Sequence, residues 1–268
     1  IYLSPVTVAK IFAGEITKWN DPAIVADNNR SVTTVVYKKD AQGNAVKDAS
    51  GNPVVLRTGT KGIIYTLPNQ PIKVVFRADG SGTTNNFTTW LNGVAPSVWT
   101  KKGNDAFTTA FPGNINASGN IGRIVGANQS QGIATLAAKT KYSITYAEKN
   151  WGDAYGLRAA YVGNATGNFT YPDSGAVSAF LGEANQDANG IVTYDYGTKV
   201  AGAYTLGIIS YMLVETEYKD KAQGAAVKQL AEHILSPACS AVDPKLGYVV
   251  VSGTFLEKAK AQIAKMNK

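Results

Sequence analysis

Residues 74–87 read Val-Val-Phe-Arg-Ala-Asp-Gly-Ser-Gly-Thr-Thr-Asn-Asn-Phe, and this stretch decides the predicted fold. It begins with an apolar, β-branched run that is typical of a buried strand. Gly80 and Gly82 follow, and they let the backbone turn tightly and approach a ligand with no Cβ in the way. A helix is predicted from about Thr83 to Leu91. A strand, a glycine-rich loop and a helix in this order favour an α/β protein.

The loop between this strand and this helix has the composition of an anion-binding site. The first backbone amides of a helix lack an acceptor within the helix and lie at the positive end of its dipole. Ser81 and Thr83 can each donate a hydroxyl hydrogen bond, and the Arg77 guanidinium matches two oxygens of a tetrahedral oxyanion. Asp79 alone would repel an anion, so we interpret it as a partner that holds Arg77 in place.

The same loop has a second interpretation, a tight strand-to-helix turn with Ser or Thr as the helix N-cap. On the loop alone, the two interpretations are equally good. Two better-known phosphate motifs do not apply here. The Walker loop requires Gly-Lys-Ser/Thr, and the dinucleotide fingerprint requires Gly-x-Gly-x-x-Gly, and neither follows this strand.

The remaining sequence alternates between helical and strand-like segments. A hairpin inserted at about 30–66 is predicted from β-branched residues at 32–37, a return strand at 54–56 and turn residues at 40–44 and 49–53. Other helices are predicted at 3–13, from 20–22 onward, and at 126–139, 174–183, 220–235 and 253–265. Other strands are predicted at 71–76, 143–147, 157–162 and 205–214, the last of them buried.

Composition excludes several classes of function. The net charge is +7, but the lysines are scattered rather than interleaved with aromatic residues, which argues against nucleic-acid binding. The single cysteine, Cys239, and the single histidine, His233, exclude an intrachain disulfide and a Cys/His zinc site. We expect a small buried residue at Cys239 and a packing or surface role for His233. No apolar run approaches the roughly 20 residues that span a bilayer.

Three segments carry a resemblance to a known family. Residues 77–91 contain Arg-Ala-Asp-Gly-Ser-Gly-Thr followed by Phe-Thr-Thr-Trp-Leu, and residues 8–24 contain Gly-Glu-Ile-Thr-Lys-Trp-Asn-Asp-Pro-Ala-Ile. Residues 163–172 read Gly-Asn-Ala-Thr-Gly-Asn-Phe-Thr-Tyr-Pro. Together they resemble the phosphate-binding protein of the phosphate ABC transporter. The similarity runs over nearly the whole chain, apart from the segment between Arg30 and Thr66.

The resemblance implies a type II periplasmic-binding-protein fold, in which two α/β lobes close on phosphate and deliver it to a membrane permease. No cofactor is implied. Asp79 would pair with Arg77, while Glu15, Lys18 and Trp19 would support the lobe without touching the ligand. The phosphate ligands implied on this chain are Arg77, Ser81, Gly82 and Thr83.

The resemblance also implies that the first lobe is incomplete. Residues 1–145 would form lobe two, with the anion loop and the inserted hairpin, and residues 146–268 would form the remaining part of lobe one. Family members carry a further segment before the part matching Ile1, with other ligands and an acidic residue that accepts the phosphate proton. Residues 1–5 show no signal peptide. We therefore expect a fragment, a chain completed by another chain, or a stand-alone relative with a different role.

We expect a non-enzymatic, extracytoplasmic protein, in the periplasm or at the cell surface, that captures inorganic phosphate for an ABC importer. One alternative is a binder of another oxyanion, such as sulfate, molybdate or an organic phosphate. A second is an adhesion or surface-interaction protein on the same scaffold, which the basic charge and the hairpin favour. A phosphatase is the weakest alternative, because the sequence offers neither a metal cluster nor an activated nucleophile.

Overall fold

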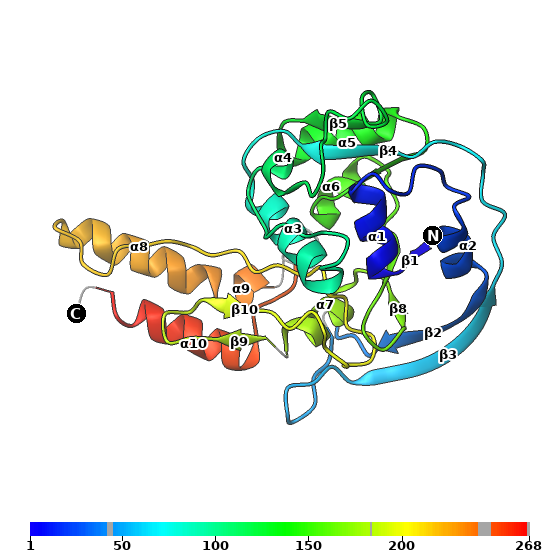
Figure 1. Cartoon of the computed structure of the whole chain (residues 1–268). Helices are drawn as coiled ribbons and strands as arrows, with labels where there is room; N and C mark the ends of the chain where they lie inside the picture. The colour runs from blue at the N-terminus through cyan, green and yellow to red at the C-terminus, as the bar shows by residue number, and fades with distance from the viewer. Residues whose placement is uncertain (42–44, 183, 241–247, 267–268) are drawn as a thin grey trace.

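The structure of the chain is a computed structural model that describes residues 1–41, 45–182, 184–240 and 248–266. Figure 1 shows a main body that carries the N-terminus, and an arm of C-terminal helices that extends from it. The helices are α1 (Pro5–Phe12), α2 (Pro22–Asn28), α3 (Gly82–Val94), α4 (Phe107–Ala110), α5 (Gln129–Lys139), α6 (Lys149–Ala154), α7 (Ser174–Leu181), α8 (Lys221–Ile234), α9 (Pro237–Ser240) and α10 (Gly253–Ile263). The strands are β1 (Tyr2–Leu3), β2 (Arg30–Tyr37), β3 (Val55–Ile63), β4 (Lys73–Arg77), β5 (Ile124–Ala127), β6 (Ser143–Thr145), β7 (Tyr161–Gly163), β8 (Phe169–Thr170), β9 (Asn185–Gln186) and β10 (Val192–Thr193).

A three-stranded parallel sheet in the order β5-β4-β6 forms the centre of the main body. Successive residues of β4 face opposite sides of this sheet. Val74 packs into the large core that contains α1 and α3, whereas Val75 packs with Ile133 of α5 on the other side. Burial on both faces explains why β4 is a continuous apolar run rather than an alternating one. The predicted α/β architecture is therefore confirmed.

A second sheet has the order β1-β7-β8, with β1 and β7 parallel. Tyr2 pairs with Tyr161, and Leu3 pairs with Val162. The buried side chain of Asn28, at the end of α2, binds both the amide and the carbonyl of Tyr2, at 3.0 and 2.7 Å. This sheet therefore joins the start of the chain to a strand that follows residue 145.

The predicted hairpin is present, with β2 and β3 antiparallel from the pair Arg30–Ile63 to the pair Tyr37–Val55. It curves along one side of the main body (Figure 1). The return strand continues to Ile63, well beyond the predicted end at residue 56. The centre of the predicted turn, residues 42–44, lies outside the described residues, and so does Glu183, the predicted end of α7.

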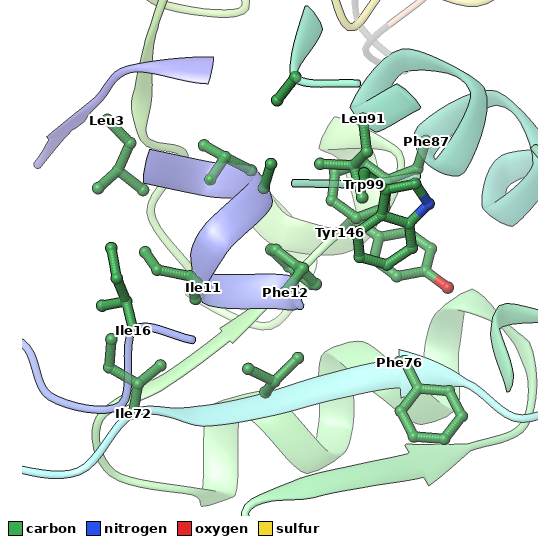
Figure 2. Packing of buried hydrophobic residues seen from close by; sticks show 14 of the residues in the cluster. Leu3, Ile11, Phe12, Ile16, Ile72, Phe76, Phe87, Leu91, Trp99 and Tyr146 are labelled. Atoms are coloured by element: carbon green, nitrogen blue, oxygen red, sulfur yellow. The ribbon is translucent and has the colours of Figure 1, made fainter. Parts of the chain in front are cut away.

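Aromatic rings fill the core between the central sheet and the helices α1, α3 and α4. Phe12 meets Phe87 edge to face with centroids 4.7 Å apart, and Phe87 stacks on Tyr146 at 4.4 Å. Figure 2 shows Phe12 pointing toward Phe87, Tyr146 and Trp99. Phe76 stacks on Phe107 at 4.7 Å and closes the core below the glycine-rich loop. Offset-stacked and edge-to-face ring contacts of this kind stabilise the fold beyond the free energy gained by burying the rings.

Two predicted elements begin at least three residues later than the sequence indicates. The helix predicted at 126–139 starts at Gln129, because residues 124–127 form β5 and Gly126 pairs with Phe76. Gln129 has a φ of 63°, so the chain turns sharply between this strand and this helix. The strand predicted at 157–162 is confined to β7, beginning at Tyr161.

The prediction of a buried strand at 205–214 is wrong. Only the beginning of this segment is held inside, where the indole of buried Trp90 donates to the buried hydroxyl of Thr205 at 2.9 Å. Ile208, Tyr211 and Met212 are exposed, and Leu213 is 93% exposed. No strand among the described residues pairs with this segment. An apolar, β-branched run is buried only where a neighbouring strand completes its hydrogen bonds.

The C-terminal arm consists of α8, α9 and α10, with the short β9–β10 hairpin beside them (Figure 1). Its apolar side chains are only partly covered, and Leu230 and Ile234 of α8 are exposed. His233 is exposed, as a surface role requires, and Cys239 is half-buried rather than buried as expected. Within the described ranges, no helix combines the length and the apolar character that crossing a bilayer requires.

Candidate anion-binding site

The glycine-rich loop follows β4 and ends at the first turn of α3. Ser81 is the N-cap of this helix, and its hydroxyl oxygen accepts a hydrogen bond from the amide of Thr84 at 3.3 Å. The amide of Ser81 donates to the carbonyl of Asp105 at 3.0 Å. The cap interpretation is thus correct for Ser81, but it uses only the oxygen of the hydroxyl. The hydroxyl hydrogen remains for another acceptor.

Two backbone amides at this helix start have no acceptor among the described residues. They belong to Gly82 and Thr83, the first two residues of α3. Neither Gly80 nor Gly82 has a positive φ, so the tight turn does not explain these glycines as we expected. A Cβ added at either position would meet no atom within 4 Å, so the space beside the loop is open. Exposed amides beside open space form the basis of an anion site.

The guanidinium of Arg77 is held on two sides. Its Nε and Nη2 donate to the two carboxylate oxygens of Asp79 at 2.8 and 2.6 Å, and its Nη1 donates to the hydroxyl of Ser130 at 3.0 Å. A guanidinium has five N–H groups, so one on Nη1 and one on Nη2 remain available. The Arg77 side chain is only 10% exposed, which restricts it to one orientation.

Asp79 has two partners. Besides Arg77, it accepts a hydrogen bond from the amide of Gln129 at 2.9 Å, so it connects the loop after β4 to the start of α5. The hydrogen bond from Arg77 holds the pKa of the Asp79 carboxyl well below its usual range, outweighing the opposite effect of burial. Asp79 is therefore ionised at neutral pH and fully paired with the guanidinium.

Tyr146, which follows β6, supports the loop from beneath. Its hydroxyl accepts a hydrogen bond from the amide of Arg77 at 3.1 Å and shares another with the hydroxyl of Thr84 at 2.8 Å. Burial raises the pKa of the Tyr146 hydroxyl, so it stays protonated. One phenol thus fixes the end of β4 relative to the first turn of α3.

Glu148 lies at the site, although the sequence analysis did not single it out. Its Oε1 accepts a hydrogen bond from the hydroxyl of Thr83 at 2.6 Å, and its Oε2 is buried with no hydrogen-bond partner among the described residues. Burial raises the pKa of this carboxyl, but the hydroxyls of Thr83 and Ser130 and the charge of Arg77 outweigh it, so the net pKa is lowered.

Residues 2–238 match the family described as PBP superfamily domain. The chain belongs to the PBP superfamily. Among its relatives, "Phosphate-binding protein PstS 2" of Mycobacterium tuberculosis (strain ATCC 25618 / H37Rv) is 27% identical over 96% of this chain and 58% of its own length. "Phosphate-binding protein PstS 3" of Mycobacterium leprae (strain TN) is 28% identical over 93% of this chain and 56% of its own length.

Solved structures of this superfamily share the fold. The ancestral soluble variant of the Human Phosphate Binding Protein superposes with a TM-score of 0.62 at 19% identity, covering 97% of this chain and 65% of that one. A phosphate binding protein from Stenotrophomonas maltophilia gives a TM-score of 0.58 at 15% identity, covering 97% and 64%. The expected type II periplasmic-binding-protein fold is confirmed. The chain spans less than two thirds of the length of these relatives.

In this PBP superfamily chain, the site lies where the carboxyl ends of three parallel strands meet. Arg77 ends β4, Gln129 follows β5, and Glu148 follows β6. Ligands of open α/β sheets bind at this edge. Glu148 could have been found from the sequence by this rule, because the strand before it was predicted.

The other residues of the family pattern lie elsewhere. The indole of Trp19 donates to the carbonyl of Tyr142 at 3.0 Å, just before β6 begins, and its amide donates to the carbonyl of Gln70. This places Trp19 at the opposite end of the central sheet from the loop. Glu15 is exposed, and Lys18 forms a bridge with Pro71 near the amino end of β4. No cluster of three or more metal-binding side chains occurs among the residues that the structure describes.

Proposed function

We propose that the protein carrying this chain captures inorganic phosphate without transforming it and delivers it to an ABC permease. One observation carries this proposal. The free amides of Gly82 and Thr83 and the remaining N–H groups of Arg77 belong to one loop, at the ligand-binding edge of the central sheet. The names of the relatives support phosphate as the anion. Capture outside the cytoplasm, at the cell surface or in the periplasm, follows from this role.

We assign the contacts with phosphate to four residues. Gly82 and Thr83 would donate from the backbone, Ser81 from its hydroxyl, and Arg77 from Nη1 and Nη2. Asp79 would hold the guanidinium without touching the ligand, as its two hydrogen bonds with Arg77 support. Dense hydrogen bonding by preorganised donors can offset the cost of removing the anion from water.

We further propose that residues 1–145 belong to lobe two and residues 146–268 to the remaining part of lobe one. The separate sheet β5-β4-β6 and the separate arm of α8 and α10 support this division. The pairing of β1 with β7 crosses the boundary and would serve as one of the connections between the two parts.

We propose that a further segment of the same protein covers the exposed apolar side of the arm. Residues 208–213 lie outside any helix or strand and expose Ile208, Tyr211, Met212 and Leu213, and Leu230 and Ile234 lie exposed on α8. A patch of this kind marks a site that another part of a protein covers. The relatives carry more than a third of their length outside the matched region, which is enough chain for this purpose.

Three alternatives remain, and each predicts a different result. Another tetrahedral oxyanion would use the same amides and guanidinium, so sulfate, molybdate or an organic phosphate would bind more tightly than phosphate. An adhesion protein on this scaffold would bind cells or matrix and show no affinity for phosphate. A phosphatase would release phosphate from an ester, for which the described residues show no metal cluster.

Titration calorimetry of the complete natural protein with phosphate, sulfate and molybdate tests the proposal. Saturable 1:1 binding that favours phosphate is the expected result. Absence of phosphate binding together with retained binding to cells would contradict it and favour adhesion. If another oxyanion binds more tightly than phosphate, the assignment of the site stands, but that oxyanion is the ligand.

A further inference from the structure

The hydroxyl of Thr83, unlike that of Ser81, already uses its hydrogen within the protein. A threonine hydroxyl has a single hydrogen and two lone pairs. In this structure the hydrogen is directed at Oε1 of Glu148, at an oxygen–oxygen distance of 2.6 Å. An ionised carboxylate can only accept hydrogen bonds, and a bond from a hydroxyl to a carboxylate is short and strong. Only the lone pairs of Thr83 Oγ1 therefore remain for a ligand.

Release of this hydrogen to a ligand would be costly. Glu148 Oε2 is buried with no hydrogen-bond partner among the described residues, and the hydroxyls of Thr83 and Ser130 are the two side-chain groups that stabilise the charge of this carboxylate. If Thr83 turned its hydrogen toward a bound anion, Oε1 would lose its 2.6 Å hydrogen bond, and Ser130 alone would remain to stabilise the charge. An unsatisfied buried charge is penalised more heavily than a neutral group.

The charges around the loop also favour an anion that carries a proton. One guanidinium, that of Arg77, faces two carboxylates, those of Asp79 and Glu148, so these three groups carry a formal charge of −1 together. Tyr146, whose hydroxyl contacts the loop, is protonated and neutral, and Asp105, a further acidic residue, contacts the loop through its carbonyl. A fully deprotonated anion meets this surplus of negative charge, whereas an anion with its own proton can donate that proton to an oxygen.

We propose that Thr83, positioned by Glu148, accepts a hydrogen bond from the ligand and thereby selects tetrahedral anions that carry a proton. This inference rests on the proposed function, since it concerns the same site. At neutral pH phosphate and arsenate keep at least one proton, whereas sulfate has none. A sulfate oxygen would face the lone pairs of Thr83 without a hydrogen between them, which is repulsive. Part of the selectivity for phosphate would thus reside in this chain.

The test compares phosphate and sulfate binding in the complete natural protein and in the variant Thr83→Val. Phosphate is titrated calorimetrically, and sulfate is measured by its displacement of phosphate. Loss of an accepting hydroxyl should weaken phosphate roughly tenfold or more, and it should not weaken sulfate, because it removes the lone pairs that repel this anion. Thr89→Val on the exposed side of α3 is the matched control and should change neither affinity. Equal weakening of phosphate and sulfate by Thr83→Val would show a donating hydroxyl and overturn the inference.

A second variant, Glu148→Leu, keeps the test decisive if Thr83→Val does not fold. It frees the hydroxyl of Thr83 to donate, so the affinity for sulfate should rise roughly tenfold relative to that for phosphate. An unchanged ratio of the two affinities would show that Glu148 has a purely structural role and would overturn the inference. Absence of phosphate binding in the unmodified protein would instead contradict the proposed function, so the two failures are distinguishable.

Discussion

Tyr146 and Phe87 stack with their ring centroids 4.4 Å apart, and the Tyr146 hydroxyl contacts the amide of Arg77 and the hydroxyl of Thr84. The ring belongs to the core, whereas the hydroxyl belongs to the floor of the candidate site. One side chain therefore connects the packing of α3 against the sheet with the conformation of the glycine-rich loop.

Tyr146→Phe should separate these two contributions. The ring stays, but the amide of Arg77 and the hydroxyl of Thr84 lose a buried partner, which costs about 1–3 kcal/mol of unfolding free energy. Urea denaturation measures this loss. Tyr142→Phe, at an exposed tyrosine, is the control and should change stability by less than about 0.5 kcal/mol. Equal stability of the Tyr146 variant and the unmodified protein would show that the loop does not depend on this hydroxyl.

Arg77→Ala should abolish phosphate binding in the complete protein while leaving it folded. Arg77 is the only cation of the loop at 77–83, and no other side chain there offers two N–H groups in one plane. Arg77→Lys keeps the charge but not the fork, so it should weaken binding substantially rather than restore it. Titration calorimetry gives both affinities, and circular dichroism checks the fold. If Arg77→Ala binds phosphate as tightly as the unmodified protein, the loop is not part of the phosphate site.

Asp79→Asn should lower stability at neutral pH, and the difference should shrink in acid. The pKa of Asp79 is depressed chiefly by its hydrogen bond with Arg77, so its stabilising effect is fully present above the unfolded pKa of about 3.9. It is lost as the pH falls below that value toward the folded pKa. Because a third of the side chain is exposed, we expect a difference of roughly 0.5–1.5 kcal/mol at pH 7.

The control for Asp79 is Asp153→Asn, which removes the exposed pair of Asp153 with Lys149 on α6. Its effect should stay below about 0.5 kcal/mol at any pH, because water screens such pairs. Urea denaturation at pH 7 and at pH 3 compares the two variants. If the loss of stability caused by Asp79→Asn is larger at pH 3 than at pH 7, the pKa of Asp79 is not lowered in the folded protein.

Leu213→Asp tests whether another segment covers the arm. In the isolated chain Leu213 is almost completely exposed, so the substitution should change stability by less than about 0.5 kcal/mol. In the complete protein the same aspartate would be buried without a partner, and a loss of about 2 kcal/mol or more is expected. Denaturation measures the stability of both proteins. If Leu213→Asp lowers stability equally little in both, no segment covers this residue.

The sequence alone determined the local features of this protein. Val74 to Phe76 are apolar and β-branched or aromatic, Ser81 has the hydroxyl of an N-cap, and the pairing of Arg77 with Asp79 spans two residues. These interactions depend on neighbours along the chain, so residue type and spacing were enough to predict the strand, the loop and the helix.

Only the tertiary structure decided which distant residues join them. Glu148 reaches Thr83 because β6 lies beside β4 in a parallel sheet, and no local pattern records that adjacency. Residues 205–214 have the composition of a buried strand, yet they are irregular and largely exposed because no described strand pairs with them. Burial of a strand is a property of its partners, and the hydrogen bonds that fix it come from elsewhere in the chain.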